Sequence, residues 1–320
     1  MANETHSLPI AQVFGNLFRG FPKLLLTNLL FAIPAAVFFG IFYAINALTG
    51  LHAFFIQLIS VIPLFPFYAG VVGVTLHLAK GEQGLQVTRT FLALVRENFS
   101  KFLVHGILFY IAVFFTYYST TLYFRLGKEN SMFYVLMVFC ILIGVLLLFF
   151  FYHVPSMTVC FDLSLKAIYR NGLLMCFGEL KSNLIATFGL FLLTVVCSTF
   201  LICCGGNPVA VIIVTIVLGL GIVPSVAAFI INSAIYKRMY AMITDHEAQS
   251  RAVDKRISEK RSEMENLRRK KAREDAAEEL RKLEIDENAD GDEYIYFNGK
   301  MMKRSVLLKM KQEAEESGEK

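Results

Sequence analysis

The sequence has few charged residues for its length. Asp, Glu, Lys and Arg make up 18% of its 320 residues, whereas hydrophobic residues make up 56%. About a quarter of the residues in an ordinary soluble domain are charged, so the composition argues against such a domain. Tryptophan is absent, while phenylalanine occurs 30 times. The composition indicates a protein that lies largely in lipid.

The few charges are unevenly distributed along the chain. Residues 1–236 hold 11 Lys or Arg and 6 Asp or Glu, whereas residues 237–320 hold 20 of each type. The net charge of +5 therefore belongs to the apolar part, because the tail is neutral overall. We predict a transmembrane domain over 1–236 and a charged cytoplasmic tail over 237–320.

Long runs without a charged residue set the number of membrane spans. Residues 24–79 form an uncharged run of 56 residues, and residues 182–236 form another of 55. Each run holds two helices of about 20 residues, the length that crosses a ~30 Å hydrocarbon layer. Residues 102–124 and 132–152 supply one span each. We therefore predict an all-α polytopic membrane protein with six transmembrane helices in three hairpins.

The positions of Lys and Arg predict an orientation. With the N-terminus inside, nine of these residues precede the tail on the inner side and only Arg125 and Lys128 lie outside. The inner set is Arg19, Lys23, Lys80, Arg89, Arg96, Lys101, Lys166, Arg170 and Lys181. Positive charge collects on the cytoplasmic side, so we expect the bacterial cell membrane with both termini cytoplasmic. The first apolar run is too long for a cleavable signal.

An amphipathic stretch precedes each outward-going helix. Apolar residues recur at helical spacing in three sets: Val13, Phe14, Leu17, Phe18 and Phe21; Phe91, Leu94, Val95, Phe99 and Phe102; and Leu165, Ile168, Tyr169, Leu173, Cys176 and Leu180. Such helices lie in the headgroup plane with their charges turned to water. We predict three units, each an interfacial helix followed by a transmembrane hairpin.

The sequence also lacks the motifs of common enzymes. It has no GxGxxG, Walker loop, HExxH or GxSxG, and its six cysteines include no CxxC pair. We therefore expect no enzyme activity, no cofactor and no disulfide framework. Asp162 is the one acid near the interior of a span, and we interpret it as the N-cap of a helix from Leu163 onward. Because buried acids are missing, ion-coupled transport is also disfavoured.

Histidines and helix breakers are the remaining polar or irregular features. His77, His105 and His153 fall at the cytoplasmic ends of the second, third and fourth spans. Neutral imidazoles that lie at a similar depth in the membrane could bind a metal or sense pH. Their spacing is not that of a metal site, so we expect no metal and a fold that tolerates their replacement by alanine. Breaks at Pro63 or Pro224 would suit a carrier's substrate site, with close helix packing as the alternative.

The order of several short motifs resembles the YesL-like (DUF624) bacterial membrane proteins over roughly residues 13–235. The motifs are Asn28-Leu29-Leu30-Phe31, Pro63-Leu64-Phe65-Pro66 followed by Gly70, Lys80-Gly81-Glu82, Arg96-Glu97-Asn98-Phe99 and Asp162-Leu163-Ser164-Leu165-Lys166. The resemblance implies a small polytopic protein of unassigned biochemistry, associated with carbohydrate uptake and utilisation genes. It carries over no catalytic residues, and the long tail departs from the usual short form.

The tail is basic first and acidic afterwards. Residues 251–273 hold ten Lys or Arg and four Asp or Glu, and residues 274–293 hold two and ten. Helix-forming residues predict a helix over about 241–284, and an Asn-Gly pair predicts a hairpin over 294–302. Because a lone hairpin is marginal in water, we expect its apolar residues to need a partner.

Two interpretations of the tail helix stay open. Val253, Ile257, Met264 and Leu267 fit the core positions of a coiled coil, but Lys260 and Lys271 interrupt the pattern. A solvated charged helix is the alternative.

The basic block lies about 15 residues beyond the last span, where an anionic inner leaflet attracts Lys and Arg. We predict that Arg268, Arg269, Lys270 and Lys271 contact the membrane surface. The expected partners are the lipid bilayer and a protein that meets the end of the tail, and not nucleic acid.

Two functions fit these features. The first is an accessory or scaffolding membrane protein linked to carbohydrate uptake or utilisation. The second is a permease or facilitator for a small neutral solute, since missing charges disfavour ion coupling alone.

Overall fold

A computed structural model describes residues 10–50, 53–82, 84–282, 285 and 292–316. The chain divides into two compact units, Met1–Ile243 and Thr244–Lys320, and the boundary lies close to the predicted one.

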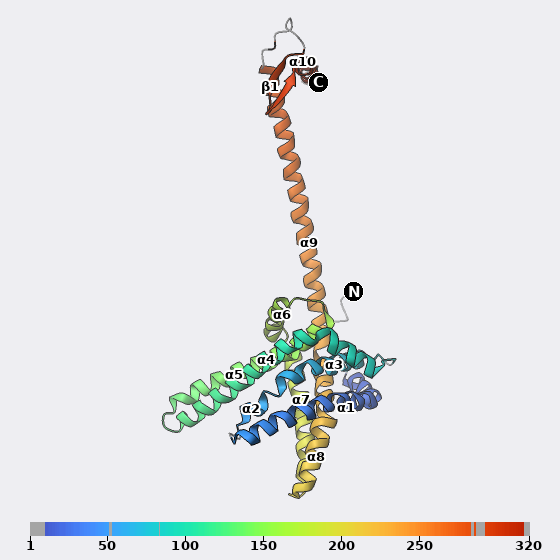
Figure 1. The fold of residues 1–320 in the computed structure, drawn as a ribbon, viewed down its shortest axis with the longest axis vertical. Helices are drawn as coiled ribbons and strands as arrows, with labels where there is room; N and C mark the ends of the chain where they lie inside the picture. The colour runs from blue at the N-terminus through green and yellow to red at the C-terminus, as the bar shows by residue number, and fades with distance from the viewer. Residues whose placement is uncertain (1–9, 51–52, 83, 283–284, 286–291, 317–320) are drawn as a thin grey trace. The chain divides into compact units, whose positions relative to one another are not determined.

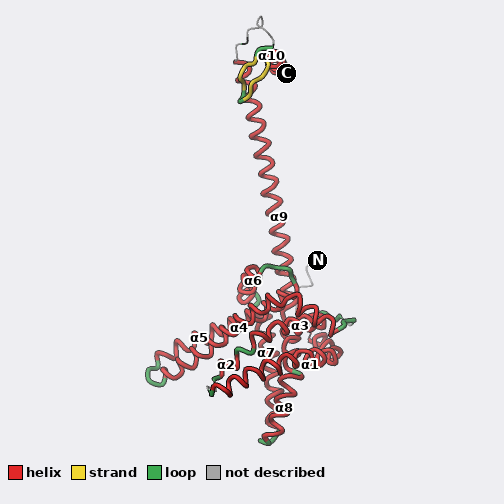
Figure 2. The backbone as a smooth tube through the Cα atoms, in the orientation of Figure 1, coloured by secondary structure: helices red, strands yellow, loops and turns green. Residues whose placement is uncertain are grey.

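The first unit is built from helices throughout its described residues (Figures 1 and 2). In chain order these are α1 Ile10–Thr49, α2 Phe54–Leu58, α3 Val61–Ala79, α4 Val87–Gly127, α5 Met132–Cys160, α6 Leu165–Gly178, α7 Leu180–Cys203, α8 Pro208–Gly221 and the start of α9 Val223–Lys282. The second unit contains the rest of α9, a β-hairpin and α10.

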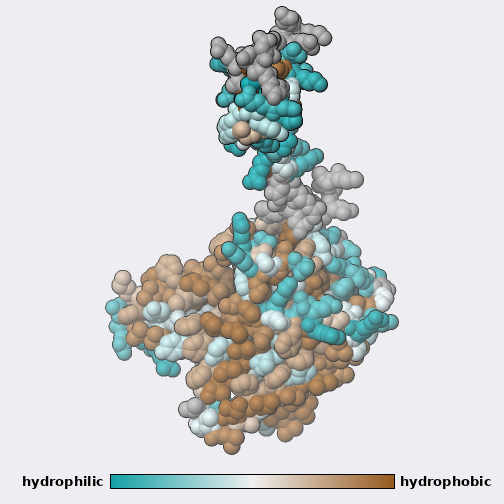
Figure 3. Space-filling view, turned by 45° about the horizontal axis from the view of Figure 1, so that its top comes forward, coloured by the Kyte–Doolittle hydropathy of each residue, from teal (hydrophilic) through white to brown (hydrophobic). Residues whose placement is uncertain are grey.

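Five of the described helices are long and apolar enough to cross a membrane. They cover Ala11–Thr49, Phe54–Ala79, Val87–Gly127, Met132–Cys160 and Leu180–Cys203. A sixth candidate is the pair Pro208–Gly221 and Val223–Thr244, which is bent by 43° at its break. Hydrophobic residues cover much of the visible surface of this unit (Figure 3). The described residues are therefore consistent with an all-α membrane protein, with five, or up to six, helices long and apolar enough to span a membrane.

Helix α3 forms the buried centre of the first unit. Most of its residues from Leu64 to Ala79 are buried, including every residue from Ala69 to Leu76. Two of them are glycines that allow α4 to approach closely. A Cβ atom on Gly70 would lie 2.5 Å from the Phe91 ring, and one on Gly73 would lie 2.1 Å from a Leu94 methyl group. The core there joins α1, α3, α4 and α9.

The amphipathic stretches are helical, but they differ from the predicted interfacial helices. The first two run without a break into the spans of α1 and α4, and only the third is a separate helix, α6. Phe91, Val95 and Phe102 are buried in the protein core, so the prediction that this face meets lipid headgroups is wrong for them. The cause is the glycine-lined surface of α3, which offers closer packing than lipid does.

The end of the chain folds into a small module. Strands β1 (Tyr294–Phe297) and β2 (Lys300–Lys303) pair antiparallel, and α10 (Arg304–Glu316) follows directly. Asn298 and Gly299 have φ angles of 46° and 78°, which a two-residue hairpin turn requires. The hairpin and the helix up to Lys282 agree with prediction, whereas α10 was not predicted.

The hairpin finds its apolar partners within its own chain. Leu280 from α9, Phe297 from β1 and Leu307 from α10 form a buried cluster. Arg304 also pairs with Glu293 at 2.6 Å. The expectation that this hairpin needs support is met on one face, without a second protein.

The described part of the α9 tail gives no support for a coiled coil. Ile257, Met264 and Leu267 are exposed. Ion pairs four residues apart stabilise the helix from within: Lys255–Glu259, Glu265–Arg269, Lys270–Glu274 and Glu278–Lys282. Each such pair contributes about 0.3–0.5 kcal/mol, so the charged residues favour a single helix.

The contact between α3 and α4 predicts a contrast between two glycines. A Cβ on Gly106 would lie 2.8 Å from the Cβ of Phe65 and 2.9 Å from the carbonyl oxygen of Ile62, whereas one on Gly40 would meet nothing within 4 Å. Gly106→Ala should therefore destabilise the protein by about 1–3 kcal/mol through overpacking. Gly40→Ala should be neutral or stabilising, because alanine favours helix. Thermal unfolding in detergent measures both, and equal midpoints for the two variants would contradict this packing.

Candidate functional site: buried polar clusters and a central cavity

The three histidines do not form one site. His77 Nδ1 lies 2.7 Å from Glu82 Oε2 near the surface, whereas His105 and His153 are fully buried in separate hydrogen-bond networks. The described residues contain no group of three His, Cys, Asp or Glu arranged to hold a metal ion.

His105 joins α4, α5 and α6. Its Nε2 lies 2.9 Å from Thr158 Oγ1, and its Nδ1 lies 2.9 Å from the Tyr169 hydroxyl. Thr158 gives its only hydroxyl hydrogen to the Val154 carbonyl, 2.8 Å away. Nε2 must therefore donate to Thr158, and Nδ1 must accept from Tyr169. The imidazole holds the amphipathic helix α6 against the spans.

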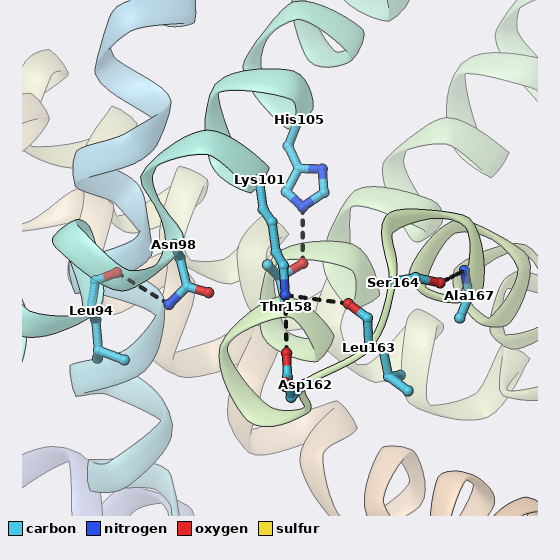
Figure 4. A network of polar contacts seen from close by, with 9 residues as sticks. All are labelled: Leu94, Asn98, Lys101, His105, Thr158, Asp162, Leu163, Ser164 and Ala167. Carbon is cyan, nitrogen blue, oxygen red and sulfur yellow. Dashed lines mark hydrogen bonds and ion pairs between the residues drawn. The ribbon is translucent and has the colours of Figure 1, made fainter.

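Lys101 lies next to His105 and makes contact with the connection between α5 and α6. Its ammonium group lies 3.5 Å from Asp162 Oδ1 and 3.3 Å from the Leu163 carbonyl oxygen (Figure 4). The predicted cap is wrong, because Ser164 caps α6 by accepting from Ala167 N at 3.3 Å. Residues 161–164 are not helical, which moves the start of the helix beyond the reach of Asp162.

His153 and Asn183 stabilise the corner between α6 and α7. Asn183 Nδ2 donates to the carbonyl oxygens of Met175 and Cys176, both at 3.2 Å. Its Oδ1 therefore faces His153 Nε2, 2.8 Å away, which donates. Removing either His105 or His153 would leave buried polar partners unpaired, so the expectation that alanine is tolerated there no longer follows.

Asn28 plays a corresponding role at the break between α8 and α9. From α1, its Nδ2 donates to the carbonyl oxygens of Gly221 and Ile222 at 2.8 and 3.0 Å. Its Oδ1 accepts from Ser225 N at 2.9 Å. Pro224 has no N–H, and a helix break inside a membrane leaves backbone groups that need hydrogen-bond partners. The side-chain amide of Asn28 provides those partners.

A third cluster joins α3, α5 and α9. Ser156 Oγ donates to Asn232 Oδ1 at 2.7 Å. Asn232 Nδ2 donates to the Val72 carbonyl oxygen at 3.0 Å and to Thr75 Oγ1 at 2.9 Å. These three side chains are buried and uncharged, so they hold the helices together without a group that titrates near neutral pH.

An open cavity of about 290 Å³ lies between the spans. Its lining comes from α1, α3, α4, α5, α7 and α9: Phe31, Val61, Leu64, Phe65, Tyr68, Phe109, Leu148, Phe151, Tyr152, Pro155, Leu190, Ala227 and Ile231. A second cavity of about 10 Å³ shares Tyr68 and Tyr152 and reaches Ser156 and Asn232. The larger space is close to the lower limit for small-molecule sites.

The sequence pointed to none of the three asparagines as a functional position. Asn28 entered only through the family resemblance. The available signal was a lone amide in a long apolar run, because an amide there is costly unless it is hydrogen-bonded. All six cysteines are free in the structure, and burial raises the pKa of the Cys176 thiol in α6 to about 11.

The predicted membrane-contact residues lie on exposed helix in the second unit. Arg268, Arg269, Lys270 and Lys271 are all exposed. Arg269 pairs with Glu265 at 2.7 Å, and Lys270 with Glu274 at 3.9 Å. Contact with a membrane therefore remains a prediction.

Asn28→Leu tests whether the amide stabilises the break between α8 and α9. The variant loses the four hydrogen bonds of the Asn28 amide, to Gly221, Ile222 and twice to Ser225, and an interhelical hydrogen bond in a membrane protein contributes roughly 0.6–1.7 kcal/mol. We expect the free energy of unfolding to fall by about 2–4 kcal/mol, measured by detergent-induced unfolding. The control is Thr215→Val, because that hydroxyl bonds only to its own helix at Val211. Equal stability of the two variants would contradict the assigned role.

Comparison with protein-family models, curated proteins and solved structures yields no match to this chain.

Proposed function

We propose that this chain is an accessory or scaffolding membrane protein that presents its terminal module to another protein. The supporting observation is the outer face of the β-hairpin. Tyr294, Tyr296 and Met301 are 55%, 68% and 59% exposed, although the opposite face packs on Leu280 and Leu307. Aromatic residues and methionine are enriched in protein interfaces, so a folded module with this face is suited to binding a protein.

The topology in this proposal has six spans in three hairpins and both termini in the cytoplasm of a bacterial cell. The bent pair of α8 and the start of α9 serves as the sixth span. The excess of nine inner over two outer Lys or Arg supports the orientation. The link to carbohydrate uptake or utilisation rests on the resemblance to YesL-like proteins over residues 13–235. We assign the chain no catalytic role.

A neutral-solute facilitator is the second candidate, and the central cavity favours it. The cavity lies among six helices and no charged side chain lines it. A free sugar is a poor fit, because its many hydroxyl groups would face mainly Phe, Leu, Val and Ile side chains. Any solute passed by this route would be less polar than a sugar.

Capture experiments in the native host test the scaffold role. Wild-type protein in mild detergent should retain a specific partner, and Tyr294→Ser combined with Tyr296→Ser should lose it, because the anchoring rings are gone. The control is Tyr117→Ser, which changes an exposed tyrosine on α4. Quantitative mass spectrometry of the eluates provides the measurement.

Retention of the same partners by the double variant would refute the proposed surface. Orientation is checked in the same cells with a cysteine at Glu129, an exposed position between α4 and α5. Labelling of that cysteine from the cytoplasmic side alone would contradict the topology.

The basic block predicts salt-sensitive membrane binding by residues 244–320. Each Lys or Arg near an anionic surface gains about 1 kcal/mol, and salt screens the attraction. The fragment should bind anionic vesicles at low salt, leave them as salt rises and not bind neutral vesicles. Changing Arg268, Arg269, Lys270 and Lys271 to Gln should abolish sedimentation with the vesicles. If the mutant sediments like the wild type, the block has no such role.

A further inference from the structure

The central cavity has one polar feature that nothing in the fold explains. Tyr68 lines both the 290 Å³ space and its 10 Å³ extension. Its ring packs against Phe31 and Phe65, at centroid distances of 6.4 and 5.7 Å. Among the described residues, its hydroxyl group has no hydrogen-bond partner. A fixed ring thus holds an unpaired donor at an apolar cavity.

The other hydroxyl and amide donors that line the cavity or its extension already donate hydrogen bonds within the protein. Thr187 gives its hydrogen to the Asn183 carbonyl at 2.8 Å, so the Tyr152 hydroxyl donates to Thr187 Oγ1 at 3.1 Å. Ser156 donates to Asn232 at 2.7 Å. Asn232 uses both hydrogens of its amide on Val72 and Thr75. The Tyr68 hydroxyl is therefore the hydrogen-bond donor in this cavity that remains available to a ligand.

The residues that line the cavity determine the charge and polarity of a ligand that could bind there. The walls are formed by Phe, Leu, Val, Ile, Ala and Pro side chains, apart from the two tyrosines. A charged ligand would lose its hydration without gaining a counter-ion, and the free-energy cost of this desolvation is prohibitive in an apolar site. A buried water normally makes about three hydrogen bonds, more than one free hydroxyl provides.

We propose that this cavity binds a small neutral amphiphile whose carbonyl or hydroxyl oxygen accepts a hydrogen bond from Tyr68. The apolar body of the ligand fills the space between α3, α5 and α9, and its oxygen lies at the Tyr68 hydroxyl, on the side of the 10 Å³ extension. The inference concerns binding alone, so it holds whether or not the ligand crosses the membrane, and it is independent of the scaffold role.

Benzophenone is a suitable probe, because it is neutral, carries a single carbonyl acceptor and forms covalent adducts under near-ultraviolet light. With full-length protein in detergent, adducts should concentrate on peptides from α3 and α5. Tyr68→Phe keeps the ring and removes the donor, so labelling at sub-saturating probe should fall about two- to tenfold, the worth of one hydrogen bond. Ala227→Phe should nearly abolish labelling by filling the cavity.

Two controls separate specific binding from partitioning into apolar surface. Tyr117→Phe, at an exposed tyrosine, should label like the wild type, and each variant must keep its melting midpoint. As competitor, 2-nonanone should protect at lower concentration than nonane, which has no acceptor. Equal labelling of Tyr68→Phe and wild type would overturn the proposal. So would equal protection by nonane, because it would indicate a site for hydrocarbon chains only.

Discussion

The structure depends on one constraint: in lipid, every backbone N–H and C=O must find its partner inside the protein. Unbroken helices meet this constraint by themselves, but the described residues of the membrane unit also contain breaks and tight corners between helices. Asn28 bonds to the carbonyl groups at the break between α8 and α9, and Asn183 bonds to those at the corner between α6 and α7. Each amide also joins a helix to its neighbour, so the groups that repair the backbone also fix the packing.

Close packing supplies the second part of the architecture. Lipid tails are as apolar as Leu or Phe, so apolar side chains gain little by leaving lipid, and helices associate through contact and hydrogen bonds. Gly70 and Gly73 give α3 a surface into which Phe91 and Leu94 fit. Ser156 and Asn232 then join the same helix to α5 and α9. Helix α3 is consequently buried along most of its length, while α7 and α8 are largely exposed.

The long apolar helices, the tail helix and the hairpin could be predicted because each depends on local sequence. Uncharged run length predicts a span, and Asn298-Gly299 predicts a turn. The burial of Phe91 and Phe102 could not be predicted, because an amphipathic pattern does not say whether lipid or protein covers the apolar face. The Asp162 cap failed for a related reason: a helix start is reliable only to a few residues. The pairing of Asn28 with Ser225 spans 197 positions in sequence, and no local pattern encodes it.

The two units differ in how they use their polar and aromatic groups. In the first, the described amides, hydroxyls and buried imidazoles are largely used for structure, and the Tyr68 hydroxyl at the cavity stands apart from this pattern. In the second, the hairpin buries Phe297 and exposes Tyr296 on the opposite face. Folding explains the buried face alone, since an exposed aromatic pair adds nothing to the core formed with Leu280 and Leu307. The exposed rings of the module and the unpaired hydroxyl of the cavity are two features that the stability of the fold does not explain, and the two binding roles proposed above rest on them.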